Sequence, residues 1–217
     1  MKIQWWGHSA FVLTAQNDKI VLTDPYESGC YNNTFNYAPI TVSADIVTAS
    51  HSHPDHFTRK LNGNPKVITK KGNYETGGIK VKGVAAFHDA NQGRDRGANI
   101  IFVYEIDGIR IVHLGDIGHT LSQKELDEIG LVDILLVPVG GHFTIDADQA
   151  SDVAGSLKPK ITMPMHYKTE VLDFPIAGVD SFIRGKKGVK KLASSEVSIT
   201  KEALPTEPEI WVLQYTK

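Results

Sequence analysis

A six-residue segment, His51-Ser-His-Pro-Asp-His56, constrains this chain more than any other part of its sequence. It places three histidines and one aspartate directly after the apolar run Asp45–Ser50. Imidazole and carboxylate groups are ligands that Zn²⁺ and similar divalent ions prefer. A tetrahedral ion that keeps one position open binds three protein ligands, and this segment offers four. The spacing therefore predicts that two metal ions share them, at the end of a strand.

Within this segment, His51 and His53 lie two residues apart and can bind one ion. Asp55 and His56 follow the intervening proline, which redirects the chain, and can bind a second ion. Chance histidines in a polar loop are one alternative, and a single structural zinc is another. A structural zinc site is normally closed by cysteines, whereas this chain has one cysteine, Cys30. The pattern therefore favours a two-ion site.

Length and composition set the class of protein. The 217 residues are enough for one substantial domain, and we expect residues 1–217 to form a single domain. The formal charge of −2 argues against general binding to nucleic acid or anionic membranes. No apolar stretch is long enough to span a bilayer, and Met1–Trp6 lacks the pattern of a secretory signal. One cysteine excludes an intramolecular disulfide, so we expect a cytoplasmic protein.

Short runs rich in β-branched residues dominate the first half of the chain. The expected strands are Lys2–Trp6, Ala10–Thr14, Lys19–Thr23, Asp45–Ser50, Lys66–Thr69, Ile79–Phe87, Asn99–Ile106 and Arg110–Leu114. Asp107-Gly108, between the last two, predicts a two-residue hairpin turn. The segment Tyr26–Pro39 has no clear period and predicts a long loop, which either lines a binding site or packs on itself.

Helices and strands alternate in the second half. A capping box from Ser122 to Glu125 predicts the start of a helix that Gly130 ends. The other expected elements are a helix from Asp146 or Asp148 to near Lys158, a helix at Val179–Arg184, and strands at Val132–Val139, Ile161–Met165 and Glu209–Tyr215. Strands followed by helix–strand alternation around one core predict a layered α/β fold with two sheets.

Three further candidate ligands, His88, Asp116 and His166, each follow an expected strand. Functional groups of layered α/β folds commonly lie at such strand ends. With these three the candidates number seven, and they divide into two sets. One ion would bind His51, His53 and His88, the other would bind Asp55, His56 and His166, and Asp116 would bridge both. This division leaves room between the ions for a water molecule, which two metals would convert to a hydroxide nucleophile.

These motifs resemble the metallo-β-lactamase superfamily of metal-dependent hydrolases. The matching motifs, in the family's chain order, are Leu22-Thr-Asp-Pro25 with its early aspartate Asp24, His51–His56, His88, Leu114-Gly-Asp116 and Met165-His-Tyr167. The resemblance implies a four-layer αββα sandwich of two mixed sheets flanked by helices, with the site at one edge between the sheets. The motifs Trp6-Gly-His-Ser9, Thr23-Asp-Pro25, Pro138-Val-Gly-Gly141 and Pro164-Met-His-Tyr167 further resemble L-ascorbate 6-phosphate lactonase-like proteins.

The resemblance implies hydrolysis by a metal-activated hydroxide, with no cofactor besides the two ions. Related di-iron proteins carry a carboxylate where this chain has His53, so imidazole here favours Zn²⁺ over iron, with Mn²⁺ as the alternative. Asp55 would bind metal and help orient the hydroxide. His142 or a second metal-bound water could supply the leaving-group proton.

The expected substrate is a small anionic lactone or ester. Arg94, Arg96 and Lys168 could bind its negative charge, although each could equally be a solvated surface charge. A phosphodiesterase or nuclease on the same ions is one alternative, and a non-enzymatic metal-binding module is the other. The sequence gives no oligomeric state.

Four polar residues near these motifs have open roles. His113 lies inside an expected strand, which favours a place in the core, and His119 rivals His88 as a ligand. His8 follows the first strand, and a place at the site edge and a structural role carry similar weight. Asp24 either orients a ligand histidine or caps a strand.

Overall fold

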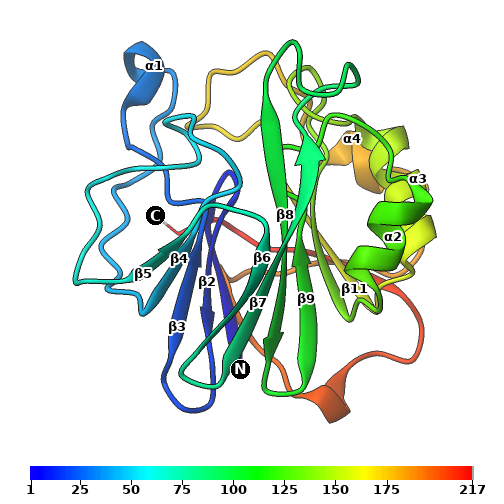
Figure 1. Cartoon of the computed structure of the whole chain (residues 1–217). Helices are drawn as coiled ribbons and strands as arrows, with labels where there is room; N and C mark the ends of the chain where they lie inside the picture. The colour runs from blue at the N-terminus through cyan, green and yellow to red at the C-terminus, as the bar shows by residue number, and fades with distance from the viewer. Residues whose placement is uncertain (217) are drawn as a thin grey trace.

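The computed structural model describes residues 1–216 and consists of two β-sheets packed face to face (Figure 1). One sheet is formed by β1 Lys2–Gly7, β2 Ala10–Thr14, β3 Ile20–Thr23, β4 Ile46–Thr48, β5 Lys66–Ile68 and β13 Glu196–Ser198. The other is formed by β6 Gly72–Thr76, β7 Ile79–Phe87, β8 Ala98–Ile106, β9 Ile109–His113, β10 Ile134–Pro138, β11 Ile161–Met165, β12 Val189–Lys191 and β14 Glu209–Val212.

Both sheets are mixed. The six-stranded sheet has the order β13-β1-β2-β3-β4-β5, in which β3, β4 and β5 run parallel. The eight-stranded sheet has the order β12-β14-β11-β10-β9-β8-β7-β6, with parallel pairing from β12 to β9 and antiparallel pairing beyond. Two mixed sheets in an α/β arrangement confirm the predicted fold class.

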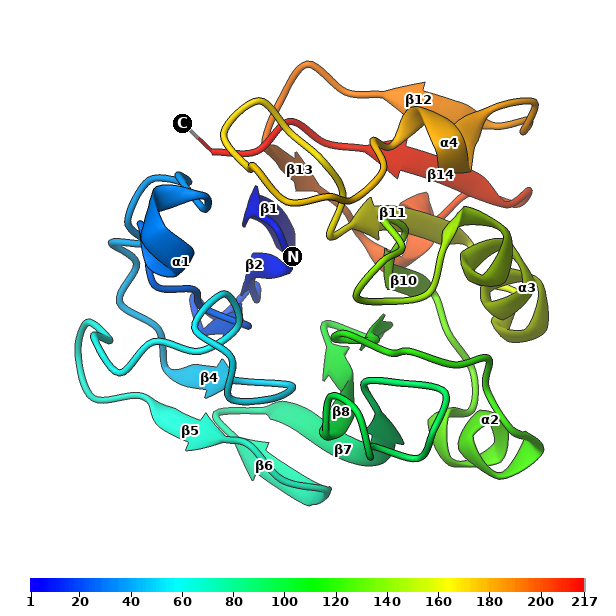
Figure 2. The same cartoon turned by 90° about the horizontal axis from the view of Figure 1, so that it is seen from above.

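Helices cover the outer face of the eight-stranded sheet. They are α2 Gln123–Ile129, α3 Ala147–Leu157 and α4 Asp180–Ile183, and Figure 2 shows α2 and α3 outside this sheet. Over the six-stranded sheet, Ile40, Val42 and Leu61 from irregular segments pack on Val12 and Leu22. These segments have no helical period, which is why this layer is mostly loop, with the single-turn helix α1 Cys30–Asn33 beside it. No helix within residues 1–216 is both long and apolar enough to cross a membrane.

Burial follows the sequence pattern of each strand. In β1, Ile3 and Trp5 are buried while Lys2 is exposed, because alternate side chains of a strand face opposite sides. The central parallel strands β10 and β11 are buried at every position, since helices and the second sheet cover both faces. Alternating runs thus form strands with one exposed face, such as β1, and the uniformly apolar runs form the centre of the eight-stranded sheet.

The predicted local signals are confirmed. Asp107 and Gly108 have φ angles of 52° and 74°, and the two positive values are those of a type I′ hairpin turn. Ser122 and Glu125 form a reciprocal capping box at the start of α2, and Gly130 caps its end. Asp146, rather than Asp148, caps α3.

Several boundaries differ from the predictions. The last strand ends at Val212 instead of Tyr215, and the helix expected at Val179–Arg184 is the single turn α4. The short strands β6, β12 and β13 were not predicted. They lie at sheet edges and are largely exposed, so pairing rather than apolar alternation defines them: β12 and β13 pair with strands distant in the sequence, and β6 forms a hairpin with β7.

A buried hydrogen bond joins the two sheets across the core. The hydroxyl of Thr48 in β4 lies 2.7 Å from the hydroxyl of Tyr104 in β8, and both residues are fully buried. The Phe102 ring packs beside Tyr104 in the same apolar core, with ring centroids 6.2 Å apart. The hydroxyl pair therefore fixes how one sheet sits on the other near the end of β4.

We predict that Tyr104→Phe lowers the free energy of unfolding by about 1–3 kcal/mol, because it leaves the Thr48 hydroxyl buried without this partner. Urea denaturation monitored by fluorescence would measure the change. The double variant Thr48→Val/Tyr104→Phe removes both polar groups and should recover part of the loss. Equal or additive losses in the double variant would contradict a direct coupling.

Candidate metal centre

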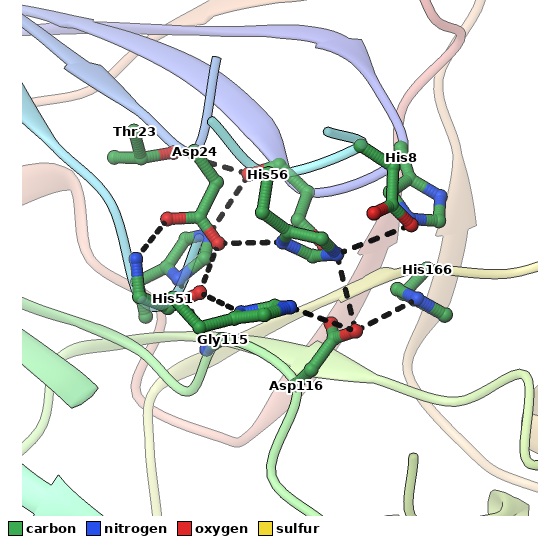
Figure 3. A network of polar contacts seen from close by, with 12 residues as sticks. His8, Thr23, Asp24, His51, His56, Gly115, Asp116 and His166 are labelled. Atoms are coloured by element: carbon green, nitrogen blue, oxygen red, sulfur yellow. Dashed lines mark hydrogen bonds and ion pairs between the residues drawn. The ribbon is translucent and has the colours of Figure 1, made fainter. Parts of the chain in front are cut away.

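The predicted ligands meet at one edge of the molecule, in loops that follow the carboxyl ends of strands from both sheets. His51, His53, Asp55 and His56 follow β4, while His88, Asp116 and His166 follow β7, β9 and β11. Figure 3 shows His51, His56, Asp116 and His166 pointing toward one another. The structure therefore brings together side chains that are far apart in the sequence.

Asp116 lies at the centre of this cluster. Its Oδ2 atom is 3.1 Å from Nε2 of His56, 3.2 Å from Nε2 of His166 and 3.3 Å from Nε2 of His88. Nε2 of His51 is 3.9 Å away. One carboxylate thus faces histidines of both predicted sets, as a bridging ligand would.

The ligand atoms fall into three overlapping groups, each with all its atoms within 4.8 Å of one another. The groups are His51, His53 and His88; His51, His56 and Asp116; and His8, Asp55, His56 and His166. The first group equals one predicted set of three. The third contains the other predicted set and adds His8, whose role the sequence left open.

Asp24 organises the loop that carries the central motif. Its carboxylate accepts hydrogen bonds from the backbone N–H and the hydroxyl of Ser50, at 2.8 and 2.6 Å. Its Oδ2 atom is also 2.8 Å from Nδ1 of His56, so Nε2 of that ring is turned toward Asp116. Asp24 is fully buried and has a φ of 40°. It orients His56, a predicted ligand, which is one of the two roles considered from the sequence.

The electrostatics suit a bound cation. Burial and then the neighbouring His166 lower the pKa of His8 to about 3, and burial and His56 do the same to His51. Burial opposes ionisation of Asp55 and Asp116, but the surrounding histidines outweigh it and hold both carboxyl pKa values below their usual range. At His56 burial also lowers the pKa, but Asp116 and Asp55 outweigh burial and raise it, so a metal ion there would displace the proton of this ring. Neutral imidazoles and ionised carboxylates are the protonation states that bind metal.

Unpaired buried atoms test whether a metal fits. Among residues 1–216, Nε2 of His51, Nε2 of His56 and Oδ1 of Asp116 are buried without a hydrogen-bond partner. The 3.1 Å approach of His56 to Asp116 lacks hydrogen-bond geometry. Leaving such atoms unpaired is costly, and a divalent cation would accept their lone pairs. The donor set, imidazole and carboxylate, fits Zn²⁺.

A cavity of about 490 Å³ opens above the cluster. Its walls are Tyr31, His53, Asp55, His88, Asp95, Arg96, Asp116, Phe143, His166 and Phe174. Tyr31 and Phe174 lie with ring centroids 5.7 Å apart, as do Phe143 and Phe174. A cavity of this size, with aromatic walls above a polar floor, can hold a small organic molecule.

Tyr31 was missed by the sequence analysis, except as part of the loop Tyr26–Pro39. It lies in α1, whose residues Tyr31 and Asn32 have left-handed φ angles of 54° and 56°. Its hydroxyl donates to Oδ1 of Asp55 at 3.1 Å, although the side chain is 44% exposed. No local signal marks this residue, because the contact depends on how the loop folds over the motif.

The other basic candidates lie outside the cavity or at its rim. His142 is exposed, its ring packs edge-on against Phe143, and its carbonyl accepts a bond from Arg96. Lys168 pairs with Asp173, and Arg94 bonds to the carbonyl of Asn91. These three side chains are not among the cavity walls, whereas Arg96 is.

Two further histidines are held away from the cluster. His119 accepts a bond from the backbone N–H of Phe87, while His88 reaches Asp116, so the structure favours His88 over its rival. His113 is fully buried, lies 2.8 Å from the carbonyl of Ser9 and accepts from the N–H of Gly115. The place in the core predicted for His113 is confirmed.

The sequence is similar to a known family and to known proteins. A family model described as a beta-lactamase superfamily domain matches residues 2–166. A UPF0173 metal-dependent hydrolase from Archaeoglobus fulgidus is 31% identical, and the alignment covers 83% of this chain and 87% of that protein. One from Thermococcus onnurineus is 30% identical over 195 residues, covering 78% and 85%.

Solved structures share the fold. A candidate Zn-dependent hydrolase of the metallo-β-lactamase superfamily from Thermotoga maritima has a TM-score of 0.83 and 37% identity, with 99% of both chains covered. An isothiocyanate hydrolase from Delia radicum gut bacteria, 15% identical, has a TM-score of 0.65 over 84% of this chain and 90% of that one.

We predict that Asp24→Asn lowers the affinity for Zn²⁺ by about 10- to 100-fold, because the amide weakens the hold on the His56 ring. Competition with a chromophoric chelator would measure the affinity. Asp45→Asn, at an aspartate that pairs with Lys19 on the surface, is the matched control and should leave it unchanged. Wild-type affinity in Asp24→Asn would contradict the assigned role.

Proposed function

This chain is a metal-dependent hydrolase of the metallo-β-lactamase superfamily, in its UPF0173 family, and we propose that two divalent ions bound at this site serve to hydrolyse a small anionic ester or lactone. The observation that carries the two-ion proposal is the position of Asp116, whose Oδ2 atom lies within 4 Å of His51 and His88 from one predicted set and of His56 and His166 from the other. Zn²⁺ is the proposed metal, with Mn²⁺ as the alternative.

Two bound ions would supply an activated water for attack and would polarise the carbonyl group of the substrate. His51, His53 and His88 would hold one ion, Asp55, His56 and His166 would hold the other, and Asp116 would be shared. Asp24 orients His56, and the aromatic rings of Tyr31, Phe143 and Phe174 form walls that exclude bulk water from the substrate. The proton donor for the leaving group, proposed at His142, stays a prediction, because that side chain is exposed and is not among the cavity walls.

Arg96 is the basis for proposing an anionic substrate. Its guanidinium lies 5.8 Å from the centre of the Phe143 ring, and one nitrogen donates to the carbonyl of His142. The loop that presents it is held by Asp89, whose carboxylate accepts four backbone N–H groups, including that of Arg96 itself. A guanidinium fixed in this way can offer its other N–H groups to a carboxylate or phosphate.

The substrate class rests on two further arguments. The cavity is small, and its aromatic walls suit a compact organic body rather than a polymer. The relatives are named for metal-dependent hydrolysis alone. The proposal of a lactone substrate therefore rests on the resemblance of this chain's short motifs to lactonase-like proteins.

We also propose a cytoplasmic location, because the one cysteine allows no disulfide within the chain.

We predict about two Zn or Mn ions per wild-type chain by elemental analysis, falling toward one in His166→Ala, because one predicted ligand set is lost. His142→Ala, which removes an exposed histidine at the rim, should retain both ions. Wild-type protein that cannot be loaded with metal, or unchanged content in His166→Ala, would refute the proposed site.

We predict that Arg96→Ala raises the KM for an anionic ester about tenfold or more, since a hydrogen bond to a charged group contributes about 1.5–3 kcal/mol. The KM for a neutral ester of the same size should change little. Arg94→Ala, in the same loop but outside the cavity, is the matched control. Assays on lactones, esters and bis-p-nitrophenyl phosphate would measure these values, and turnover of the phosphodiester alone would replace the proposed substrate class.

A further inference from the structure

His8 lies where the two sheets meet, beside the candidate metal centre. The pairing of β1 with β2 is irregular between Trp5 and Gly7, and the chain then turns through Gly7 and His8 with φ angles of 107° and 50°. A side chain on Gly7 would lie 2.3 Å from the Tyr37 ring, so only glycine allows this approach. The turn carries His8 out of the sheet and toward the site.

Two hydrogen bonds fix the backbone of His8. Its carbonyl accepts from Nε1 of Trp5 at 3.0 Å and from the backbone N–H of His166 at 3.1 Å. His166 also has a left-handed φ, of 51°. Left-handed backbone at two non-glycine residues is strained and persists only where its surroundings enforce it. The strain here places two imidazole rings side by side, with centroids 4.0 Å apart.

The side chain of His8 has one polar contact, to a predicted ligand. It is fully buried, and its Nε2 lies 3.2 Å from Oδ2 of Asp55. Its Nδ1 has no hydrogen-bond partner among residues 1–216. The His8 ring therefore contacts the candidate metal centre through the carboxylate of Asp55, from the buried side of that carboxylate.

Asp55 is thus held at both oxygens. His8 contacts Oδ2 from the buried side, and the hydroxyl of Tyr31 donates to Oδ1 from the exposed side. A carboxylate rotates easily about its terminal torsion, so an unsupported Asp55 would sample several orientations. Of its two contacts, the buried one is the stronger constraint, because hydrogen bonds gain strength where water is excluded.

We infer that His8 is a positioning residue of the metal centre, which fixes the carboxylate of Asp55 and thereby sets the affinity for the ion assigned to Asp55, His56 and His166. The inference rests on the proposed two-ion site. His8 does not belong to the group formed by His51, His53 and His88, so the affinity for the other ion should not depend on it. The effect is therefore selective for one ion.

The test measures binding of each ion to the full chain by Co²⁺ titration, read from the visible spectrum, and by Zn²⁺ competition. We expect His8→Ala to lower the affinity for one ion about 10- to 100-fold and to leave the other unchanged. His8→Gln should recover most of the loss, because its amide N–H can donate to Asp55. Thermal denaturation and circular dichroism of the metal-free variants confirm that each is folded.

A double-mutant cycle with Asp55→Asn isolates the pathway of the effect. If His8 acts through Asp55, His8→Ala causes little further loss in the Asp55→Asn background. An equal loss in both backgrounds, or a loss in His8→Gln as large as in His8→Ala, overturns the positioning role. Two ions bound normally by His8→Ala overturn this inference alone, whereas fewer than two ions in the wild type overturn the proposed two-ion site as well.

Discussion

Three carboxylates buried within one small volume are the constraint on which the site depends. Asp24, Asp55 and Asp116 are each at least nine-tenths buried, and their pKa values lie below the usual range. Ionised groups withdrawn from water need opposite charge and hydrogen bonds close by, or their burial would destabilise the fold. The histidines and the Ser50 backbone meet part of this need, and cations bound at the proposed site would meet more of it. Neither sheet alone supplies them, so the charge requirement couples the two sheets.

Much of the architecture could be predicted because its signals are local. The apolar alternation of Lys2–Trp6, the hairpin residues Asp107-Gly108 and the capping box at Ser122 act over a few positions, and the structure contains all three. The motif His51–His56 is also local, and its density of ligands identified the centre. His88, Asp116 and His166 could be added because strand ends in layered α/β folds gather at one edge.

The remainder depended on contacts that no sequence window contains. His8 approaches Asp55 only because Gly7 permits a tight turn against Tyr37. Tyr31 reaches the same carboxylate from a loop without periodicity. Arg96 and Arg94 look alike in the sequence, and only the fold of their loop separates a cavity wall from a surface charge. Edge strands such as β12 arise from pairing with distant residues, since their own residues are polar and exposed.

The bond from the N–H of His166 to the carbonyl of His8 joins the beginning of the chain to its last predicted ligand. A ligand that binds the folded chain but not the unfolded one stabilises the fold by about 2.7 kcal/mol at 100 times its dissociation constant. Ions held by groups from both sheets would thus resist their separation. A shortage of metal in the cell would then affect more than catalysis. Chains made without metal would unfold more often and be degraded by proteases sooner. The amount of enzyme would therefore follow the metal supply.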